Sequence, residues 1–301
     1  SATCALLSGL SKWVAYQLNP IVMTVPSHIK DTNDLLHTLR SFTWNRVDLL
    51  GSLDVKALYT SIPKTQCIGA ISSLLHSHAH PLAHLLVVAI ELLFDGNYFT
   101  FNGHLYRQVN GCPMGYSHSP QLADLYLHCH ESPVVPRHMH IPLFKRYLDD
   151  ILVVLRPTRT GPNAAALLSA LARDLAELSC LTFEEEPPGP TLNFLDLTLT
   201  LTNGALVTRP YEKPHNLFLY PTAHSAQPKG LLKGLIWGRL LAYHTHCTYR
   251  ADFLHAADNL LHRLIARGHC PRLTKKLIKK RTEELCSQAP AAEPNWPAKK
   301  P

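Results

Sequence analysis

The chain has 301 residues, 46% of them hydrophobic and 17% charged, which is enough apolar material for one large or two modest cores and argues against disorder throughout. Its longest apolar stretch, residues 81–94, is interrupted by His84 and Glu91 and falls short of the ~20 apolar residues that cross a bilayer. We therefore expect no membrane-spanning segment and no membrane partner. The eight cysteines are dispersed without a CxxC pair and the first residues show no secretory signal, so we expect a reducing, intracellular location.

The formal charge of +7 is unevenly distributed along the chain. Residues 1–210 contain 14 Lys and Arg against 16 Asp and Glu, whereas residues 211–301 contain 15 against 6. A basic last third after a slightly acidic body suggests a part that neutralises the phosphates of a nucleic acid. From charge alone, the alternative is a solvated basic helical face.

In the body of the chain, helix-like apolar periodicity alternates with short strand-like runs. The predicted helices cover residues 32–42, 64–78, 81–93, 121–130 and 163–178, and the predicted strands cover residues 48–54, 98–101, 104–108, 144–147, 151–155, 192–201 and 205–210. The Asn203-Gly204 pair between the last two strands is a strong signal for a two-residue hairpin turn. Strand pairs mixed with long helices favour an α+β fold over regular βαβ alternation.

The last third is predicted to be a small, basic, helical unit. Three helix-like stretches cover residues 229–244, residues 251–267 with Gly268 as a C-terminal cap, and a segment from about residue 272 in which lysines surround an apolar stripe. From about Ser287 the chain is rich in Pro, Ala and Lys without apolar periodicity, which predicts a disordered tail.

Two adjacent acids, Asp149 and Asp150, lie between apolar flanks in the segment KRYLDDILVV. Adjacent side chains of a continuous strand point to opposite faces, so the two carboxylates share a site only if the chain turns there, as in a hairpin with the acids at its tip. Composition predicts about 0.02 chance occurrences of the pattern YxDD in this chain. The alternative is an exposed acidic turn.

A third acid, Asp54, ends the apolar segment VDLLGSLDV. One carboxylate from a strand end, brought beside the hairpin tip, would make a site for divalent cations. Carboxylates with water and phosphate oxygens are the ligands that Mg²⁺ prefers, and two such ions can clamp the attacking and leaving oxygens of an in-line phosphoryl transfer. Taken alone, such an acid is more often a solvated strand end.

Between these acids lies QVNGCPMGYSHSP, a glycine-rich turn before a predicted helix that begins at Ser119 or Pro120. Such a turn lets the backbone approach a flat or anionic ligand closely. Alone it is a weak signal, but its order and spacing relative to the two acidic segments make it a strong one.

Taken in order, these segments resemble those of reverse transcriptases, most closely the enzymes of Penelope-like retroelements, which are relatives of telomerase. LDVKALYTSIP is similar to the family's palm motif A, QVNGCPMGYSHSPQLADLYL to motif B and RYLDDILVV to the YxDD motif C. Later family markers follow in order: LTFEEE, NFLDLTLT, the YEKP of residues 211–214, and HSAQPKGLLKGLIWGRLLAY at the start of the thumb. The resemblance covers residues 10–277.

The resemblance implies a right-hand polymerase palm, which is an antiparallel sheet with packed helices, followed by an α-helical thumb. It divides the chain into a remnant of the fingers and connection (residues 1–46), the palm (47–214), a basic thumb (215–286) and the tail (287–301). The basic fingers strands that grip the triphosphate, and the GIY-YIG endonuclease that often follows the polymerase, have no counterpart in this sequence. We therefore expect an N-terminally incomplete or degenerate polymerase core with its fingers mostly missing.

Carried over position by position, the resemblance also implies roles for individual residues. Two Mg²⁺ ions, or Mn²⁺ in their place, would be held by Asp54, Asp149 and Asp150, with the Val55 carbonyl as a further ligand. Tyr59 would stack under the sugar of an incoming deoxynucleoside triphosphate and disfavour a 2′-hydroxyl. The residues implied to contact the nucleotide are Val55, Tyr59, Gln108, Gly111, Met114 and Gly115, and those implied to bind nucleic acid are Tyr147, Lys213, Lys229, Lys233, Lys275 and Lys276. For Tyr59 and Met114 the alternative is ordinary core packing.

Two functions remain open from the sequence. The first is an RNA-directed DNA polymerase of a retrotransposon, acting in the nucleus on an RNA template and a DNA primer. The second is a catalytically dead remnant that binds nucleic acid through its basic C-terminal helices. The 19 histidines match no common zinc spacing, so we do not expect a zinc site.

Overall fold

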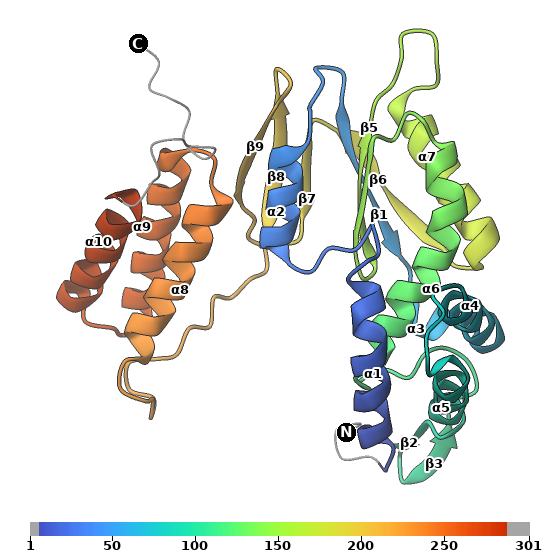
Figure 1. Ribbon diagram of the computed structural model, residues 1–301. Helices are drawn as coiled ribbons and strands as arrows, with labels where there is room; N and C mark the ends of the chain where they lie inside the picture. Colours follow the sequence, from blue (N-terminus) through green and yellow to red (C-terminus); the bar gives the residue numbers. More distant parts are fainter. Residues whose placement is uncertain (1–5, 288–301) are drawn as a thin grey trace. The chain divides into compact units, whose positions relative to one another are not determined.

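The computed structural model describes residues 6–287, and the chain divides into two compact units (Figure 1). Unit 1 contains the described residues up to Lys30 together with Val47–Gly189. Unit 2 contains Asp31–Arg46 and the described residues from Pro190 onward. Residues 288–301 of the predicted tail lie outside the described residues. No helix in the described part of the chain is both long and apolar enough to cross a membrane.

Unit 1 is built on a four-stranded antiparallel sheet with the strand order β4-β5-β1-β6. Its strands are β1 (Leu49–Val55), β4 (Leu143–Tyr147), β5 (Asp150–Leu155) and β6 (Phe183–Gly189). Helix α7 (Ala164–Ser179) packs on one face of this sheet, as Figure 1 shows. The packing is tight at Gly51, where an added Cβ would lie 3.0 Å from Leu155 and 3.4 Å from Leu168. The central strands are therefore buried, which explains their nearly continuous apolar sequence.

The other elements of unit 1 include helix α6, whose apolar residues are buried on most of its sides. These elements are α1 (Ser8–Val22), α3 (Leu58–Ser61), α4 (Lys64–Ser77), α5 (Ala83–Asp95), the hairpin β2 (Tyr98–Phe101) and β3 (His104–Arg107), α6 itself (Ser119–Val134) and the 3₁₀ turn Val135–Arg137. Helices α1, α4 and α7 all pack against α6. The core of this unit continues from the sheet through α6 to the helices beyond it.

Unit 2 combines a three-stranded antiparallel sheet with four helices. The sheet has the order β7-β8-β9, and the elements are α2 (Thr32–Ser41), β7 (Thr191–Phe194), β8 (Leu197–Thr202), β9 (Ala205–Pro210), α8 (Leu231–His246), α9 (Arg250–Ala266) and α10 (Pro271–Ser287). Helices α8–α10 enclose their own apolar core, which includes Ile236, Phe253 and Ile278. Helices α8–α10 therefore form a helical part of the chain with its own core.

The structure confirms the predicted α+β class and several local signals. Asn203 and Gly204 both have positive φ angles, 53° and 79°, which is the type I′ hairpin geometry. Helix α6 begins at Ser119, and Gly268, just beyond the end of α9, has a φ of 86°, as expected of a glycine that terminates a helix.

One predicted strand is wrong, and one strand was not predicted. Residues 192–201 do not form a single strand, because the chain turns back between β7 and β8, with Leu195 in the left-handed region at a φ of 51°. Strand β6 has the sequence FEEEPPG, which lacks alternating apolar residues and contains two prolines. It lies at the edge of the sheet, where proline and charged side chains are tolerated.

Candidate active site

The two adjacent acids lie at the tip of a hairpin in unit 1. Strands β4 and β5 pair in antiparallel register with Tyr147 opposite Asp150, so Leu148 and Asp149 form the two-residue turn between them. Leu148 has a φ of 55°, a backbone conformation that is unfavourable for a residue with a branched side chain. The turn therefore depends on surrounding contacts to hold its shape.

Asp54 lies beside this turn. On β1 it is directly opposite Asp150 of β5, and the Val55 amide donates to the Asp149 carbonyl at 3.1 Å. On its other side Asp54 is opposite Glu184 of β6. Since directly opposed residues of antiparallel strands project from the same face, Asp150, Asp54 and Glu184 form a line of three carboxylates across three strands, which we call the acidic row.

The acidic row concentrates negative charge at an accessible position. Asp54 is the only exposed residue of β1, yet its pKa is raised above the usual range by partial burial and then by the charges of Asp149 and Glu184. Lys56 offers partial compensation through its ion pair with Glu184, with Nζ and Oε1 3.0 Å apart, but both side chains are more than half exposed. Since like charges on directly opposed strand positions destabilise a sheet, the three carboxylates repel one another at this position.

The donor set of this site fits magnesium in its chemistry. Asp54, Asp149 and Asp150 supply carboxylate oxygens, which Mg²⁺ prefers, and Mg²⁺ commonly completes its shell with water and substrate phosphates. Within the described residues no group of three or more His, Cys, Asp or Glu side chains is arranged so that it could hold a metal ion. The three acids therefore lie close together at the end of β1 and the neighbouring turn, but in the described part of the chain they do not form a metal site closed by protein ligands.

Tyr59 connects the acids to the glycine-rich loop. Partial burial raises the pKa of its hydroxyl to about 12, with Asp149 as the next largest cause. The Tyr59 carbonyl accepts a hydrogen bond from the Cys112 amide at 2.5 Å. Gly111 has a φ of 80°, and a Cβ there would lie 2.6 Å from the Thr60 Cα atom. Only glycine allows the loop to approach the chain after β1 this closely.

A cavity of about 660 Å³ opens beside this loop, with Thr60, Asn97, Gln108, Met114 and Tyr116 among its lining residues. Gln108 is fixed in its wall, since its side chain accepts from Asn97 Nδ2 at 2.6 Å and donates to the Asn110 carbonyl at 2.8 Å. The Met114 side chain is 61% exposed, which is inconsistent with the core-packing alternative for that residue. The three acids do not line this cavity.

Gly115, like Gly111, lies in the glycine-rich loop with a positive φ, 86°. Val55 is buried at the end of β1, and Tyr147 is partly buried at the end of β4. The structure therefore groups the residues expected at the metal and nucleotide sites within unit 1, around the end of β1 and the loop before α6. Their individual roles remain predictions.

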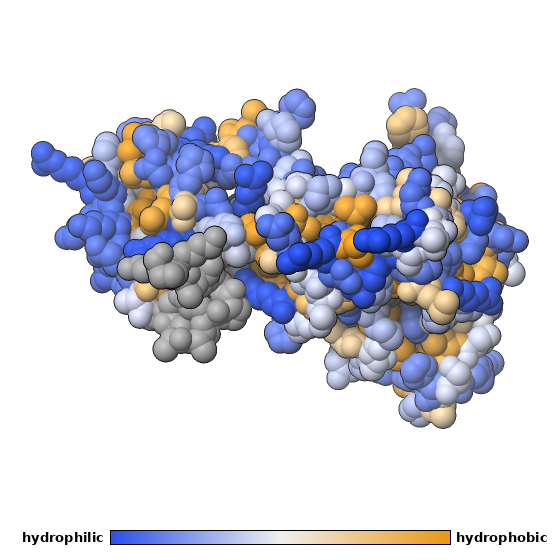
Figure 2. All heavy atoms as spheres, turned by 90° about the horizontal axis from the view of Figure 1, so that it is seen from above, coloured by the Kyte–Doolittle hydropathy of each residue, from blue (hydrophilic) through white to orange (hydrophobic). Residues whose placement is uncertain are grey.

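The basic residues expected to bind nucleic acid belong to unit 2. Lys213 contributes to a small groove with Tyr211 and His215. Lys229 precedes α8, and Lys233 on α8 lies 5.2 Å from the centre of the Trp237 ring. Lys275 and Lys276 are exposed on α10, and hydrophilic side chains predominate over the α8–α10 part, at the left of Figure 2.

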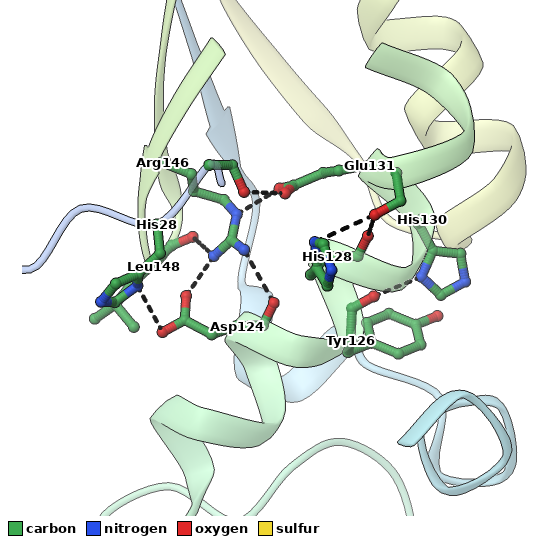
Figure 3. A network of polar contacts seen from close by, with 10 residues as sticks. His28, Asp124, Tyr126, His128, His130, Glu131, Arg146 and Leu148 are labelled. Atoms are coloured by element: carbon green, nitrogen blue, oxygen red, sulfur yellow. Dashed lines mark hydrogen bonds and ion pairs between the residues drawn. The ribbon is translucent and has the colours of Figure 1, made fainter. Parts of the chain in front are cut away.

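Two features of the site were not anticipated from the sequence. Glu184 belongs to LTFEEE, a segment used only as a family marker, and the fully buried Arg146 lies just before the turn. Arg146 pairs with Asp124 and Glu131 of α6 (Figure 3). These two acids are seven residues apart on α6, a spacing that places them on one face and could have indicated a buried basic partner.

Comparisons with known proteins identify the fold but no family. No protein-family model matches the chain, and no curated protein matches it. Among solved structures, telomerase from Candida albicans in complex with a fragment of telomeric RNA is 14% identical with a TM-score of 0.62, and the match covers 95% of this chain and 48% of that one. Apo telomerase from Candida tropicalis is 15% identical with a TM-score of 0.56, covering 94% of this chain and 51% of that one.

A more distant similarity is to the RNA polymerase complex inside a double-stranded RNA virus, at 13% identity and a TM-score of 0.50, covering 66% of this chain and 20% of that one. This chain has the α+β fold, with antiparallel sheets and packed helices, of nucleic-acid polymerase domains. It spans about half the length of the telomerase chains that it matches.

Proposed function

We propose that this chain is the core of a reverse transcriptase, an RNA-directed DNA polymerase of the Penelope-like retroelement kind that acts in the nucleus. The observation that carries the proposal is the placement of Asp54 and Asp150 on directly opposed strand positions, next to the turn that holds Asp149. The same unit contains the glycine-rich loop and, at that loop, a cavity large enough for a nucleotide. The polymerase fold supports it independently.

In this proposal the reaction joins a primer 3′-hydroxyl to the α-phosphate of a deoxynucleoside triphosphate and releases pyrophosphate. Asp54 and Asp149 would hold two Mg²⁺ ions, with Asp150 and the Val55 carbonyl in support. When bound, the ions supply electrostatic stabilisation of the in-line phosphoryl transfer. Tyr59 would lie under the sugar, and the Gly111–Gly115 loop would hold the incoming base against the template.

Primer extension on an RNA template in the presence of Mg²⁺ tests the proposal. Asp149→Ala should abolish extension while leaving binding of the primed template nearly unchanged, because Asp149 would act on the metal and not on the duplex. Asp174→Ala is the matched control, since this acid lies on α7 and pairs with His138. Robust extension by Asp149→Ala would place the chemistry elsewhere.

The second candidate function is nucleic-acid binding without catalysis. It is favoured by the exposed lysines on α10 and by the independent core of α8–α10, neither of which depends on the acids. A wild-type chain that binds a primed template but adds no nucleotide with either Mg²⁺ or Mn²⁺ would support this function over the first. Failure to bind any primed template would contradict both.

A further inference from the structure

The side chain of Arg146 is completely buried next to the turn that carries Asp149. Its guanidinium makes four hydrogen bonds (Figure 3). Nε donates to Glu131 Oε1, and Nη1 donates to Asp124 Oδ1 at 2.5 Å and to the Leu148 carbonyl at 3.2 Å. Nη2 donates to the backbone carbonyl of Asp124 at 2.9 Å. One side chain thus contacts two acids of α6 and the backbone of the turn.

The alternation of strand residues explains why Arg146 points inward. It is opposite Ile151 on β5, whereas its neighbour Tyr147 is opposite Asp150. Because adjacent strand residues face opposite sides, Tyr147 shares the face of the acidic row and Arg146 faces α6. The network therefore lies on the side of the sheet opposite the proposed metal site.

Ser27 and His28 hold the two acids of the network from the other side. Ser27 donates through its Oγ to Glu131 Oε2 at 2.6 Å, and its carbonyl accepts from the Arg146 amide at 2.7 Å. His28 Nδ1 lies 3.5 Å from Asp124 Oδ2. Burial alone would raise the pKa of Asp124, but the contacts with His28 and Arg146 hold it below the usual range. The carboxylate is therefore ionised and paired.

A contribution to folding stability is a weak explanation for such a network, because the cost of desolvating buried charges often exceeds their mutual attraction. Well-packed apolar residues of similar volume often give a protein that is equally stable or more stable. What apolar residues could not supply is a donor to the Leu148 carbonyl. That carbonyl belongs to a residue in the left-handed region, a conformation that persists only where surrounding contacts enforce it.

We propose that Arg146 is a positioning residue, which fixes the Leu148–Asp149 turn to helix α6 and thereby sets the turn and the glycine-rich loop before α6 in one geometry. The consequence for catalysis rests on the proposed function, whereas the consequence for the turn does not. Loss of Arg146 should leave the sheet in place while the turn samples other conformations.

Amide hydrogen exchange of the full chain tests this directly, since the Val55 amide donates to the Asp149 carbonyl and reports on the turn. Arg146→Met leaves Asp124 and Glu131 without their partner and could unfold the protein. The decisive variant is therefore Arg146→Met combined with Asp124→Asn and Glu131→Gln, which removes all three charges together. Its unfolding midpoint should approach that of the wild type, while exchange at Val55 should accelerate about tenfold or more.

The matched control is Arg156→Met, at the other end of β5. Arg156 pairs with the buried Asp48 at 2.6 Å, and its own amide donates to the His140 carbonyl. This variant should accelerate exchange near residue 156 but leave Val55 protected. If the triple variant retains wild-type protection at Val55, or if Arg156→Met exposes Val55 equally, Arg146 serves only general stability and the inference is wrong.

Primer extension gives a second readout. Arg146→Lys keeps the positive charge but lacks the planar fork of donors, so kcat should fall more than about tenfold with the nucleotide KM little changed, which indicates loss at the transition state and not in binding. If the wild-type chain shows no extension, the proposed function fails, yet exchange at Val55 still decides the role of Arg146.

Discussion

Asp54 and Asp150 are directly opposed on neighbouring antiparallel strands, although 95 residues separate them in the sequence. The backbone hydrogen bonds between β1 and β5 hold them there, and Glu184 extends the line on the other side of Asp54. Because the strands set this spacing, the carboxylates stay close together even when no cation offsets their repulsion. Stability should therefore respond to divalent cations and to the neutralisation of single acids.

The first prediction concerns Asp54→Asn. Because the pKa of Asp54 is raised in the folded state, its ionised form opposes folding above that pKa, and this cost is relieved as the pH falls through it. At neutral pH without divalent cations, Asp54→Asn should be as stable as the wild type or more stable, by less than ~1 kcal/mol because the side chain is exposed. Mg²⁺ should raise the melting temperature of the wild type more than that of the variant.

The control for this experiment is Asp174→Asn, which removes an acid that pairs with His138 on α7. Its response to Mg²⁺ should equal that of the wild type. An equal response of Asp54→Asn to Mg²⁺ would show that the acidic row does not bind the ion.

The second prediction compares two glycines that have similar backbone conformations. Gly111 and Gly103 have φ angles of 80° and 77°, but only at Gly111 would a Cβ atom collide with backbone, that of Tyr59 and Thr60. Gly103→Ala should cost about 1 kcal/mol for the left-handed conformation alone, and Gly111→Ala should cost about 2 kcal/mol or more. Denaturant unfolding measures both costs, and equal values would show that the loop does not depend on close approach.

Local sequence signals predicted much of the fold because short-range chemistry determines those elements. The type I′ turn at Asn203 and Gly204, the start of α6 at Ser119 and the Asp149 hairpin all follow from residue type and nearest neighbours. The turn after β7 was not predicted, because Leu195 adopts a left-handed backbone conformation. Glycine or asparagine at such a position would have indicated a turn, whereas leucine does not.

The parts of the site that depend on distant segments were not predictable in the same way. The burial of Arg146 results from packing against α6, and the position of Glu184 results from the pairing of β6 with β1. The sequence FEEEPPG contains no periodicity that would indicate a strand. This segment is a strand because it pairs with β1.

The third prediction concerns His118, which is fully buried just before α6, with Nδ1 2.9 Å from Ser11 Oγ. Burial lowers its pKa from 6.5 to about 4. Since the unfolded chain binds the proton more tightly in this range, stability should fall as the pH decreases from about 6.5 to about 4, by up to ~3 kcal/mol from this residue. His118→Gln should remove that part of the pH dependence of denaturant unfolding.

Other histidines with lowered pKa values, such as His246, contribute to the same slope, so the difference between variants is the quantity to measure. His104→Gln, at an exposed position of β3, should leave the slope unchanged. A wild-type slope in His118→Gln would mean that the imidazole takes up a proton as readily in the folded state as in the unfolded chain.

The last prediction concerns four lysines on α10: Lys275, Lys276, Lys279 and Lys280, all exposed. Two of them pair loosely with acids one turn along, Lys279 with Glu283 at 3.8 Å and Lys280 with Glu284 at 3.9 Å. Such exposed pairs contribute at most about 1 kcal/mol, so replacing all four lysines with glutamine should preserve the fold.

If this face of α10 follows a nucleic-acid backbone, the quadruple variant should bind all sequences more weakly and with less dependence on salt. Each lost phosphate contact removes ~0.9 from the slope of log affinity against log salt concentration on duplex DNA, because fewer counterions are released. Fluorescence anisotropy with a labelled duplex over a series of salt concentrations measures the slope. Neutralising Arg159 and Arg173 of unit 1 is the control, and should leave the slope unchanged. An unchanged slope in the quadruple variant would show that the basic face of α10 is only solvated, and the nucleic-acid contacts would then have to come from other parts of the chain.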